Sequence, residues 1–478
     1  MILLYSLIGL LILLFLWILF RTWAFKPHPL EEIKTDKPKI DEARAIASLQ
    51  AMLRIKTVSY EDKKKEDKAA FDAFKELLIT RYPNINQKAT FQDVGETGLL
   101  FIIKGENPQE PIVLMSHYDV VPENGIWQKD PFCGDIVNDR IYGRGAIDTK
   151  STLASIMEAT NKRLSDNKPL KRDLYLAFSG DEETRGPSAP AIVQYLKDHG
   201  VRPWLVLDEG GAIVEQPFPG VSTSAAFIGL AEKGYANINI KARVQGGHAS
   251  MPPKQMAITK LAKAIRILDK DALFKKRLTK PTRLMFDNLA RHSKSLKIKI
   301  AFANLWCFMP FVKLNAKKSP LLASLLKTTQ SFTTMNGSDA MNVLPSSASI
   351  GINYRIISGE SKESVLKKVQ SKVKKLGLEV KMEKGADPTP TSKMDAAYTL
   401  LQKTIQNIYG GVIITPYLMM AGTDARYHHD ISDYVYRFSP MVFSKEDRRM
   451  VHSTDEAVKI STYLDCVAFY HRLLGNIT

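Results

Sequence analysis

Cysteine is scarce in this sequence, and its scarcity argues against two kinds of stabilising site. Only three cysteines, Cys133, Cys307 and Cys466, occur among 478 residues, and none is grouped with histidines. Neither a disulfide framework nor a cysteine-based metal site is therefore predicted. We expect the three thiols to be small, buried apolar side chains.

The chain also lacks the composition of a disordered or polytopic membrane protein. Hydrophobic residues make up 45% of the sequence and charged residues 24%, which is typical of a globular protein. Because domains usually contain roughly 100–200 residues, a chain of this length is expected to form two lobes or more.

Acidic residues are fewer than basic ones, but the imbalance is local. The chain has 67 Lys and Arg residues against 50 Asp and Glu residues, a net charge of +17, and residues 254–327 hold 18 of the basic residues with only three acids. No nucleic-acid recognition motif accompanies this charge, so nucleic acid is not a predicted partner.

The same basic insertion is also apolar, and two interpretations of it remain open. Leu305, Trp306 and Phe308 lie close in sequence to Lys313 and Lys317. The segment could be a lid helix that packs on its own lobe with a solvated lysine face. Alternatively, it lies on an anionic bilayer and admits a fatty acyl chain.

Long hydrophobic runs are absent except at the N-terminus. Residues 1–20 carry no charged side chain, and as a helix they would span roughly 30 Å of hydrocarbon. No small-residue cleavage site follows, which favours an uncleaved signal anchor over a cleaved signal peptide. Arg21 and Lys26 on its far side favour a cytoplasmic body. Residues 21–39, with three prolines, are expected to be a linker.

After the linker, short apolar runs alternate with helical patterns. This alternation predicts an α/β fold with a mostly parallel central sheet, whose ligands bind beyond the carboxyl ends of the strands. The expected strands are residues 99–103, 112–115, 174–178 and 204–207, and the expected helices between them are 151–164 and 189–196.

Metal-binding residue types follow these strands directly. His117 and Asp119 follow the second strand, Glu182 and Glu183 the third, and Asp208 the fourth. A further acid, Asp148, lies in a glycine-containing loop just before a helix. One such acid is usually a turn or cap residue. Four groups at consecutive strand or helix ends instead predict a two-zinc site, in which carboxylates offset the charge of two cations.

Several sequence strings resemble one known family. SHYDVVP, GRGAIDTK, SGDEETRG and LDEGG, followed by GGHAS and NVLP, resemble the co-catalytic zinc peptidases that include aminoacylase-1, carboxypeptidase S and the glutamate carboxypeptidases. The resemblance extends from about residue 40 to the C-terminus. It implies that one zinc is bound by His117, Asp148 and Asp208, and the other by Asp148, Glu183 and His452, with cobalt or manganese as alternatives. It further implies that Glu182 is the general base and that Asp119 supports His117.

A second, inserted domain is expected within the catalytic one. Residues 232–387 begin and end with period-two apolar patterns, which indicate an α+β lobe between two catalytic segments, 40–231 and 388–478. The resemblance implies that this lobe is a lid and a dimerisation domain. It also implies that His248 stabilises the oxyanion, often from the partner subunit of a homodimer, and that Asn342 contacts substrate.

Arg426 lies in a loop that resembles the substrate-proximal motif of the family. Its guanidinium could clamp a substrate carboxylate, or it could form a structural salt bridge with Asp424 or another acid.

The segment at the end of the lid narrows the substrate class. Glutamate carboxypeptidases carry a carboxylate-binding arginine there, whereas this chain reads KGADPTP at 384–390. That segment and the long insertion resemble carboxypeptidase S and the N-fatty-acyl-amino-acid synthase/hydrolases. The resemblance implies a hydrolase of the amide between an acyl group and an amino acid, reversible under mass action, in an extracytoplasmic, vacuolar or secreted location.

Two alternatives remain open. The chain could be a carboxypeptidase or dipeptidase acting on short peptides. It could also be a catalytically inactive lipid-binding or scaffold protein that has kept the fold.

Overall fold

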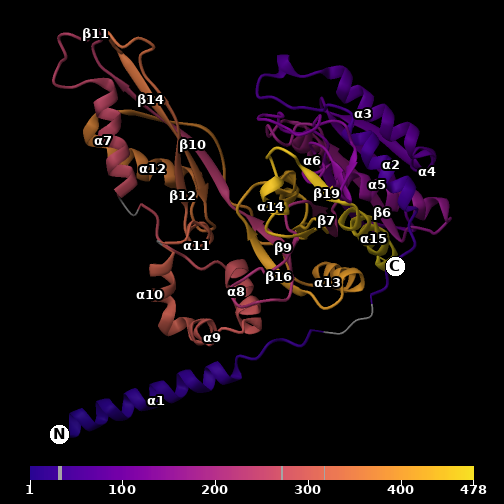
Figure 1. Cartoon of the computed structure of the whole chain (residues 1–478), viewed down its shortest axis with the longest axis horizontal. Helices are drawn as coiled ribbons and strands as arrows, with labels where there is room; N and C mark the ends of the chain where they lie inside the picture. Colours follow the sequence, from indigo (N-terminus) through magenta and orange to yellow (C-terminus); the bar gives the residue numbers. More distant parts are fainter. Residues whose placement is uncertain (31–34, 271–272, 317, 478) are drawn as a thin grey trace.

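The computed structural model describes residues 1–30, 35–270, 273–316 and 318–477. It has a larger lobe, a smaller lobe and an N-terminal helix that projects from the body (Figure 1). Residues 31–34 of the predicted linker and Lys317 of the basic insertion lie outside the described residues.

The larger lobe is built on a ten-stranded mixed sheet. Its strand order is β1-β2-β6-β3-β7-β17-β9-β8-β18, and β16 also pairs with β9. The strands are β1 (Ala89–Val94), β2 (Gly98–Ile103), β3 (Asn107–His117), β6 (Arg172–Ser179), β7 (Leu205–Asp208), β8 (Ile213–Val214), β9 (Ala225–Glu232), β16 (Ile413–Met419), β17 (Val435–Arg437) and β18 (Val442–Phe443).

The centre of this sheet is parallel, as the sequence predicts. Strand β3 pairs in parallel with both β6 and β7, and β17 pairs in parallel with β7. Antiparallel pairs occur towards the edges, where β1 joins β2 and β2 joins β6. The α/β class with a mostly parallel sheet centre is therefore confirmed, and the sheet as a whole is mixed. The carboxyl ends of β3, β6 and β7 meet at one edge.

Helices cover both faces of the large sheet. One face is covered by α2 (Glu42–Leu53), α5 (Lys150–Ser165), α13 (Ala396–Tyr409) and α15 (Ile460–Asn476), and the other by α6 (Ser188–Asp198). Along the chain, α2 and the first strand, β1, are separated by η1 (Lys63–Lys65), α3 (Lys68–Arg81) and α4 (Pro83–Lys88). An aspartate caps the N-terminus of α2 and another that of α3. The Asp41 side chain accepts a hydrogen bond from Arg44 N, and the Asp67 side chain accepts one from Ala69 N.

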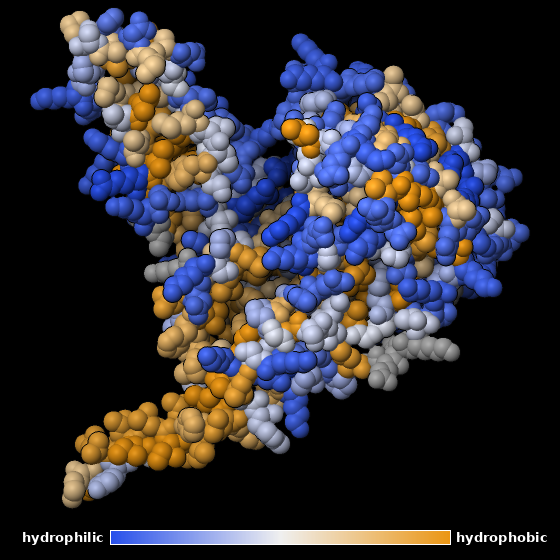
Figure 2. Space-filling view, viewed as in Figure 1, coloured by the Kyte–Doolittle hydropathy of each residue, from blue (hydrophilic) through white to orange (hydrophobic). Residues whose placement is uncertain are grey.

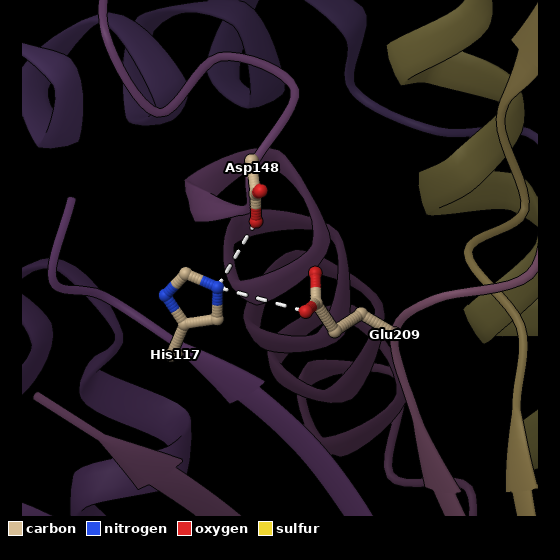
Figure 3. A group of neighbouring side chains, drawn as sticks. All are labelled: His117, Asp148 and Glu209. Atoms are coloured by element: carbon tan, nitrogen blue, oxygen red, sulfur yellow. Dashed lines mark hydrogen bonds and ion pairs between the residues drawn. The ribbon is translucent and has the colours of Figure 1, made fainter. Parts of the chain in front are cut away.

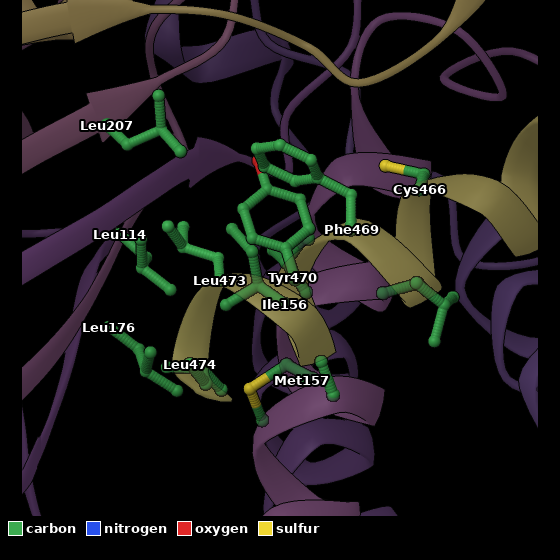
Figure 4. Close-up of a cluster of buried hydrophobic side chains, with 14 of the residues drawn as sticks. Leu114, Ile156, Met157, Leu176, Leu207, Cys466, Phe469, Tyr470, Leu473 and Leu474 are labelled. Carbon is green, nitrogen blue, oxygen red and sulfur yellow. The ribbon is translucent and has the colours of Figure 1, made fainter. Parts of the chain in front are cut away.

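The main core lies between the parallel strands and two of these helices. Figure 4 shows α15 side chains, among them Phe469, Leu473 and Leu474, against Leu114 of β3 and Leu176 of β6. Nearly every residue of α5 is buried, so this helix is enclosed by α15, α2 and the sheet. The α5 helix begins at the edge where the carboxyl ends of β3, β6 and β7 meet, and its burial therefore fixes the loop that precedes it.

The cysteine expectation is confirmed at one position only. Cys466 on α15 is buried in the main core, whereas Cys133 and Cys307 are half-buried. Cys133 lies in an irregular segment near the short strands β4 (Ile136–Val137) and β5 (Arg140–Tyr142), and Cys307 on a surface helix.

The smaller lobe is a four-stranded antiparallel sheet with two helices on one face. The order is β12-β14-β10-β15, formed by β10 (Gly234–Arg243), β12 (Thr329–Asn336), β14 (Ser347–Ile356) and β15 (Glu379–Ala386). Alternate residues of β10 and β14 are buried, so the period-two pattern of the sequence places one face against α7 (Ala257–Lys270) and α12 (Lys362–Val373). A short pair, β11 (Gly247–His248) and β13 (Val343–Leu344), forms the far tip (Figure 1).

A buried ion pair fixes the base of the smaller lobe on the larger one. Glu232, the last residue of β9, accepts a hydrogen bond from Arg437 Nε at 2.6 Å, and both side chains are fully buried. Thr423 donates to the same carboxylate from its hydroxyl and its backbone N–H. Because β10 begins directly after β9, this network sets where the smaller lobe leaves the large sheet.

Besides α7, the described residues of the basic insertion form four helices below the small sheet. They are α8 (Lys280–His292), α9 (Leu296–Ala303), α10 (Leu305–Asn315) and α11 (Pro320–Leu326). The N-terminal helix α1 (Ile2–Ala24) passes beside α9 (Figure 1). It continues past the predicted end at Phe20, and its length and mean hydropathy of 2.9 suit a membrane span or a signal sequence equally.

Truncating one core side chain of α15 tests the packing around α5. We expect Leu473→Ala to lower the free energy of unfolding by about 2–5 kcal/mol, because it removes a fully buried side chain and leaves a cavity. Urea denaturation followed by circular dichroism would measure the change. The control is Lys403→Ala, which truncates an exposed side chain of α13 and should leave the midpoint almost unmoved. Equal midpoints for the two variants would contradict this account of the core.

Candidate metal centre

The predicted ligands converge where three parallel strands end. His117 is the last residue of β3, Asp208 is the last residue of β7, and Glu182 and Glu183 follow the end of β6. Asp148 precedes the buried helix α5. The carboxyl edge of the sheet therefore gathers residues that are far apart in the sequence, as expected for a parallel α/β sheet.

The first group joins His117, Asp148 and Glu209. His117 Nε2 lies 3.0 Å from Asp148 Oδ1 and 3.7 Å from Glu209 Oε1 (Figure 3). The other ring nitrogen of His117, Nδ1, lies 3.0 Å from the main-chain oxygen of Asp119. A proton on Nδ1 would be held by that oxygen, which leaves Nε2 free to bind a cation.

The second group shares Asp148 with the first. His452 Nε2 lies 3.0 Å from Asp148 Oδ2 and 3.3 Å from Glu183 Oε1. Asp148 thus directs one carboxylate oxygen to each group, as a bridging carboxylate between two cations must.

The structure differs from the predicted ligand set at one position. Asp208 is buried, and its oxygens accept hydrogen bonds from the backbone N–H groups of Glu209 and Ala425, at 2.9 and 2.8 Å. Glu209 takes the place beside His117 that the sequence interpretation gave to Asp208. Glu209 directly follows β7, and its carboxylate reaches towards His117 Nε2, whereas the Asp208 oxygens are hydrogen-bonded to backbone N–H groups.

Asp119 contacts both His117 and the loop that carries the candidate base. It is fully buried, and its carboxylate oxygens accept hydrogen bonds from the backbone N–H groups of Glu182 and Glu183, each at 3.1 Å. Its Oδ1 also lies 3.3 Å from His117 Nδ1, and Ser59 Oγ donates to Oδ2. Asp119 therefore positions two parts of the site at once.

Crowded carboxylates give the centre an excess of negative charge. Burial raises the pKa of Glu182 and Glu209, and neighbouring carboxylates add to the rise. Burial also raises the pKa of Glu183. Hydrogen bonds to Asp148 and Glu183 raise the pKa of His452 to about 10. Such a cluster is stabilised by bound cations, and its nitrogen and oxygen donors suit divalent metal ions. The residues thus fit two metal ions.

A cleft of about 400 Å³ opens over these groups. The carboxylates line it together with two arginines, Arg185 and Arg355, which sequence reasoning missed. Arg185 stacks on the ring of Tyr235 at 4.0 Å. Burial, together with the charge of Arg185, lowers the pKa of Arg355. Arg185 could have been suspected from its place three residues after Glu182, and Arg355 from its place at the end of the 348–355 pattern.

Arg426 has protein partners in the structure. Its NH2 group donates to Asp387 O at 2.9 Å, and NH1 lies 3.7 Å from Glu232 Oε2. Asp424 instead accepts a hydrogen bond from Ser179 Oγ. From the sequence, Arg426 is expected either to clamp a substrate carboxylate or to form a structural salt bridge. The structure shows it in a salt bridge, with Glu232 as the acid.

His248 and Asn342 lie together, but far from the metal groups. His248 is exposed on β11, where its ring contacts Ser250 Oγ, and Asn342 is exposed beside β13. The main-chain oxygen of Asn342 accepts a hydrogen bond from Ala249 N. Both residues are at the far tip of the smaller lobe, while the metal groups lie at the edge of the large sheet (Figure 1).

Comparisons with known proteins agree with this architecture. The sequence model of peptidase family M20/M25/M40 matches residues 113–476. The chain is 30% identical to N-fatty-acyl-amino acid synthase/hydrolase PM20D1.1 of Danio rerio, over 97% of this chain and 93% of the relative. It is 32% identical to probable carboxypeptidase S-like 2 of Dictyostelium discoideum, over 88% of this chain and 82% of the relative.

Solved structures share the fold at low sequence identity. An M20 family metallo-carboxypeptidase of Sulfolobus solfataricus has a TM-score of 0.69 at 18% identity, covering 91% of this chain and 99% of that one. Human carnosine dipeptidase 1 has a TM-score of 0.65 at 15% identity, covering 91% and 96%. A Bacillus subtilis member, described as a dinuclear metal binding peptidase, has a TM-score of 0.54 at 12% identity, covering 91% and 97%.

Substituting the two adjacent acids separately tests which one binds metal. We expect Glu209→Gln to lower the metal content measured by elemental analysis by one ion per chain. Asp208→Asn should keep the metal, because its carboxylate is hydrogen-bonded to backbone N–H groups. The opposite pattern, with metal lost only from Asp208→Asn, would restore the assignment made from the sequence. Circular dichroism of both variants controls for loss of fold.

Proposed function

The chain belongs to peptidase family M20/M25/M40, and we propose that it is a membrane-attached two-zinc hydrolase of the amide bond between an acyl group, fatty acyl groups included, and an amino acid. The observation that carries this proposal is the cleft, which is lined by the candidate metal ligands together with Arg185 and Arg355. The similarity to a synthase/hydrolase along almost the whole chain supports the same substrate class. Mass action would also allow the reverse, amide-forming direction.

The metal ligands follow from the two groups of side chains. His117, Asp148 and Glu209 would hold one zinc, and Asp148, Glu183 and His452 the other. Bound zinc would polarise the amide carbonyl and lower the pKa of bound water. Cobalt and manganese accept the same nitrogen and oxygen donors and are the alternative metals.

Glu182 is the proposed general base. It lines the cleft beside Glu183, and Asp119 holds its backbone N–H. The carboxylate would accept the proton of the attacking water and return it to the leaving nitrogen. Burial raises the pKa of Glu182, which favours the protonated carboxyl needed for the second of these transfers.

The two arginines of the cleft suit the free carboxylate of an amino acid. A guanidinium group can bind two carboxylate oxygens at once. Arg355 and Arg185 both line the cleft, whereas Arg426 is already engaged with Glu232 and Asp387. We therefore assign the carboxylate to Arg355 and Arg185, and give Arg426 the role of positioning the ring of Tyr235, which it contacts at 5.8 Å.

The apolar lining of the cleft suits the acyl side of the substrate. Met419, Phe443 and Val451 contribute to it. Met420, next to Met419 in the sequence, belongs to one apolar cluster with Met309 and Leu322 of the basic insertion, so this cluster reaches the segment that lines the cleft. This continuity favours a long acyl chain over a second polar residue.

A short peptide with a free C-terminus is the second candidate substrate. Its carboxylate would use the same arginines, and similarity to a carboxypeptidase S-like relative supports it. The third alternative, an inactive scaffold, is disfavoured because the site keeps a complete donor set together with Glu182.

A homodimer would complete the site. His248 and Asn342 are exposed at the tip of the smaller lobe, away from the metal groups of their own chain. We propose that they act on the centre of a partner subunit, where the His248 ring would stabilise the oxyanion.

Glu182→Gln separates metal binding from turnover. We expect the variant to keep its metal content and to lose a factor of about 10²–10⁴ in kcat on N-oleoyl-phenylalanine, because a general base of the correct pKa is missing. Hydrolysis is measured by release of phenylalanine, and parallel rates on an unacylated dipeptide distinguish the two substrate classes. Undiminished turnover would refute the role of Glu182.

Arg355→Ala tests the carboxylate assignment. We expect kcat/KM for N-oleoyl-phenylalanine to fall by about 10–100-fold, the loss expected for a charged hydrogen bond of about 1.5–3 kcal/mol. The rate on N-oleoyl-phenylalaninamide, which lacks the carboxylate, should change little. Arg243→Ala is the matched control, because Arg243 is exposed on the smaller lobe and pairs with Glu379. Equal losses on both substrates would mean that Arg355 is structural.

A further inference from the structure

The helices α9 and α10 carry large apolar side chains on the outside of the protein. Leu296 of α9 is 65% exposed, and Trp306, Phe311 and Leu314 of α10 are 54%, 62% and 58% exposed. Leu321 at the start of α11 is 62% exposed. A cluster of this kind on a soluble surface usually marks contact with another protein or with a membrane.

This apolar surface is continuous with the N-terminal helix. Figure 2 shows the apolar surface of α1 continuing onto the adjoining part of the helical insertion. Phe25, directly after α1, is buried with Ala290 of α8 and Ala303 of α9, and Phe218 and Phe302 pack against them. The two apolar surfaces therefore belong to one structural unit.

Polar contacts fix α1 against the junction of α9 and α10. Arg21 Nε donates to Ala303 O at 3.0 Å, and Asn304 Nδ2 donates to Thr22 Oγ1 at 3.2 Å. Arg291 of α8 stacks on Phe25 at 4.3 Å and donates to Lys26 O. The last turn of the apolar helix is thus attached to the insertion rather than separated from it by the linker.

Lysines lie close in sequence to the apolar side chains of this surface. Lys294, Lys297 and Lys318 are exposed, and Lys299 and Lys313 are half-buried. Apolar side chains flanked by lysines are typical of helices that lie in the interface of a bilayer, where the apolar part enters the acyl boundary and the ammonium groups meet anionic headgroups.

We propose that α9 and α10 form a second membrane contact beside α1, with Leu296, Trp306, Phe311 and Leu314 inserted into the interfacial region of a lipid bilayer. The partner is lipid rather than protein, because the surface is continuous with a helix apolar enough to cross a membrane. The contact is independent of the catalytic proposal, since none of these side chains lines the cleft.

The proposed contact is tested by measuring how deeply single labelled side chains of the full-length protein enter a lipid bilayer. In a Cys133→Ser, Cys307→Ser background, Phe311→Cys would carry a spin label, with Leu314→Cys as a second position. The control is Ile126→Cys, because Ile126 is an apolar residue of the larger lobe that is 93% exposed. The protein would be placed in lipid nanodiscs, either of phosphatidylcholine alone or of phosphatidylcholine with phosphatidylserine.

We expect the labels at 311 and 314 to relax with dissolved oxygen more than with a water-soluble nickel chelate, and the label at 126 to show the reverse. Equal nickel access at 311, 314 and 126 would overturn the proposal. Shielding of 311 and 314 from both reagents would also overturn it and would indicate a second protein chain on this surface. Labels that lie deeper in the bilayer when phosphatidylserine is present would support the role of the lysines. Equal label depths in the two lipid compositions would contradict that role.

Discussion

The burial of several carboxylates around Asp148 is the constraint on which the rest of the structure depends. The loop before α5 must hold Asp148 so that each of its oxygens faces a different histidine. Glu456 fixes this loop, because its carboxylate accepts hydrogen bonds from the backbone N–H groups of Ile147 and Asp148 and pairs with the buried Arg144 at 2.7 Å.

The same contacts join the two ends of the larger lobe. Glu456 belongs to the segment that carries His452, and β19 (Ala457–Lys459), which follows it, pairs with β5. Gly143 N also donates to Glu456 O. The segment that supplies the last histidine is therefore held by the loop that supplies the bridging aspartate, and the site can form only when the C-terminal part of the chain has folded onto the central sheet.

Sequence patterns predicted those parts of the site whose residues directly follow a recognisable strand. The runs before His117 and Glu182 are strands in a parallel sheet, so their ends had to meet, and this fold class is confirmed. The choice between Asp208 and Glu209 depends on which adjacent side chain turns towards His117. Arg185 belongs to the larger lobe and Arg355 to the smaller lobe, and both line the cleft because the two lobes face each other. The sequence pattern around either arginine does not predict how the lobes are arranged.

The attachment of α1 to α9 changes how the chain would meet a lipid-like substrate. A protein held at a membrane by two adjacent contacts has lost most of the rotational freedom that a single tethered helix leaves. For such a protein, the relevant concentration of an acylated substrate is its mole fraction in the bilayer, reached by lateral diffusion in two dimensions. Diluting the membrane with inert lipid would then slow the reaction even when the total amount of substrate in the vessel is unchanged.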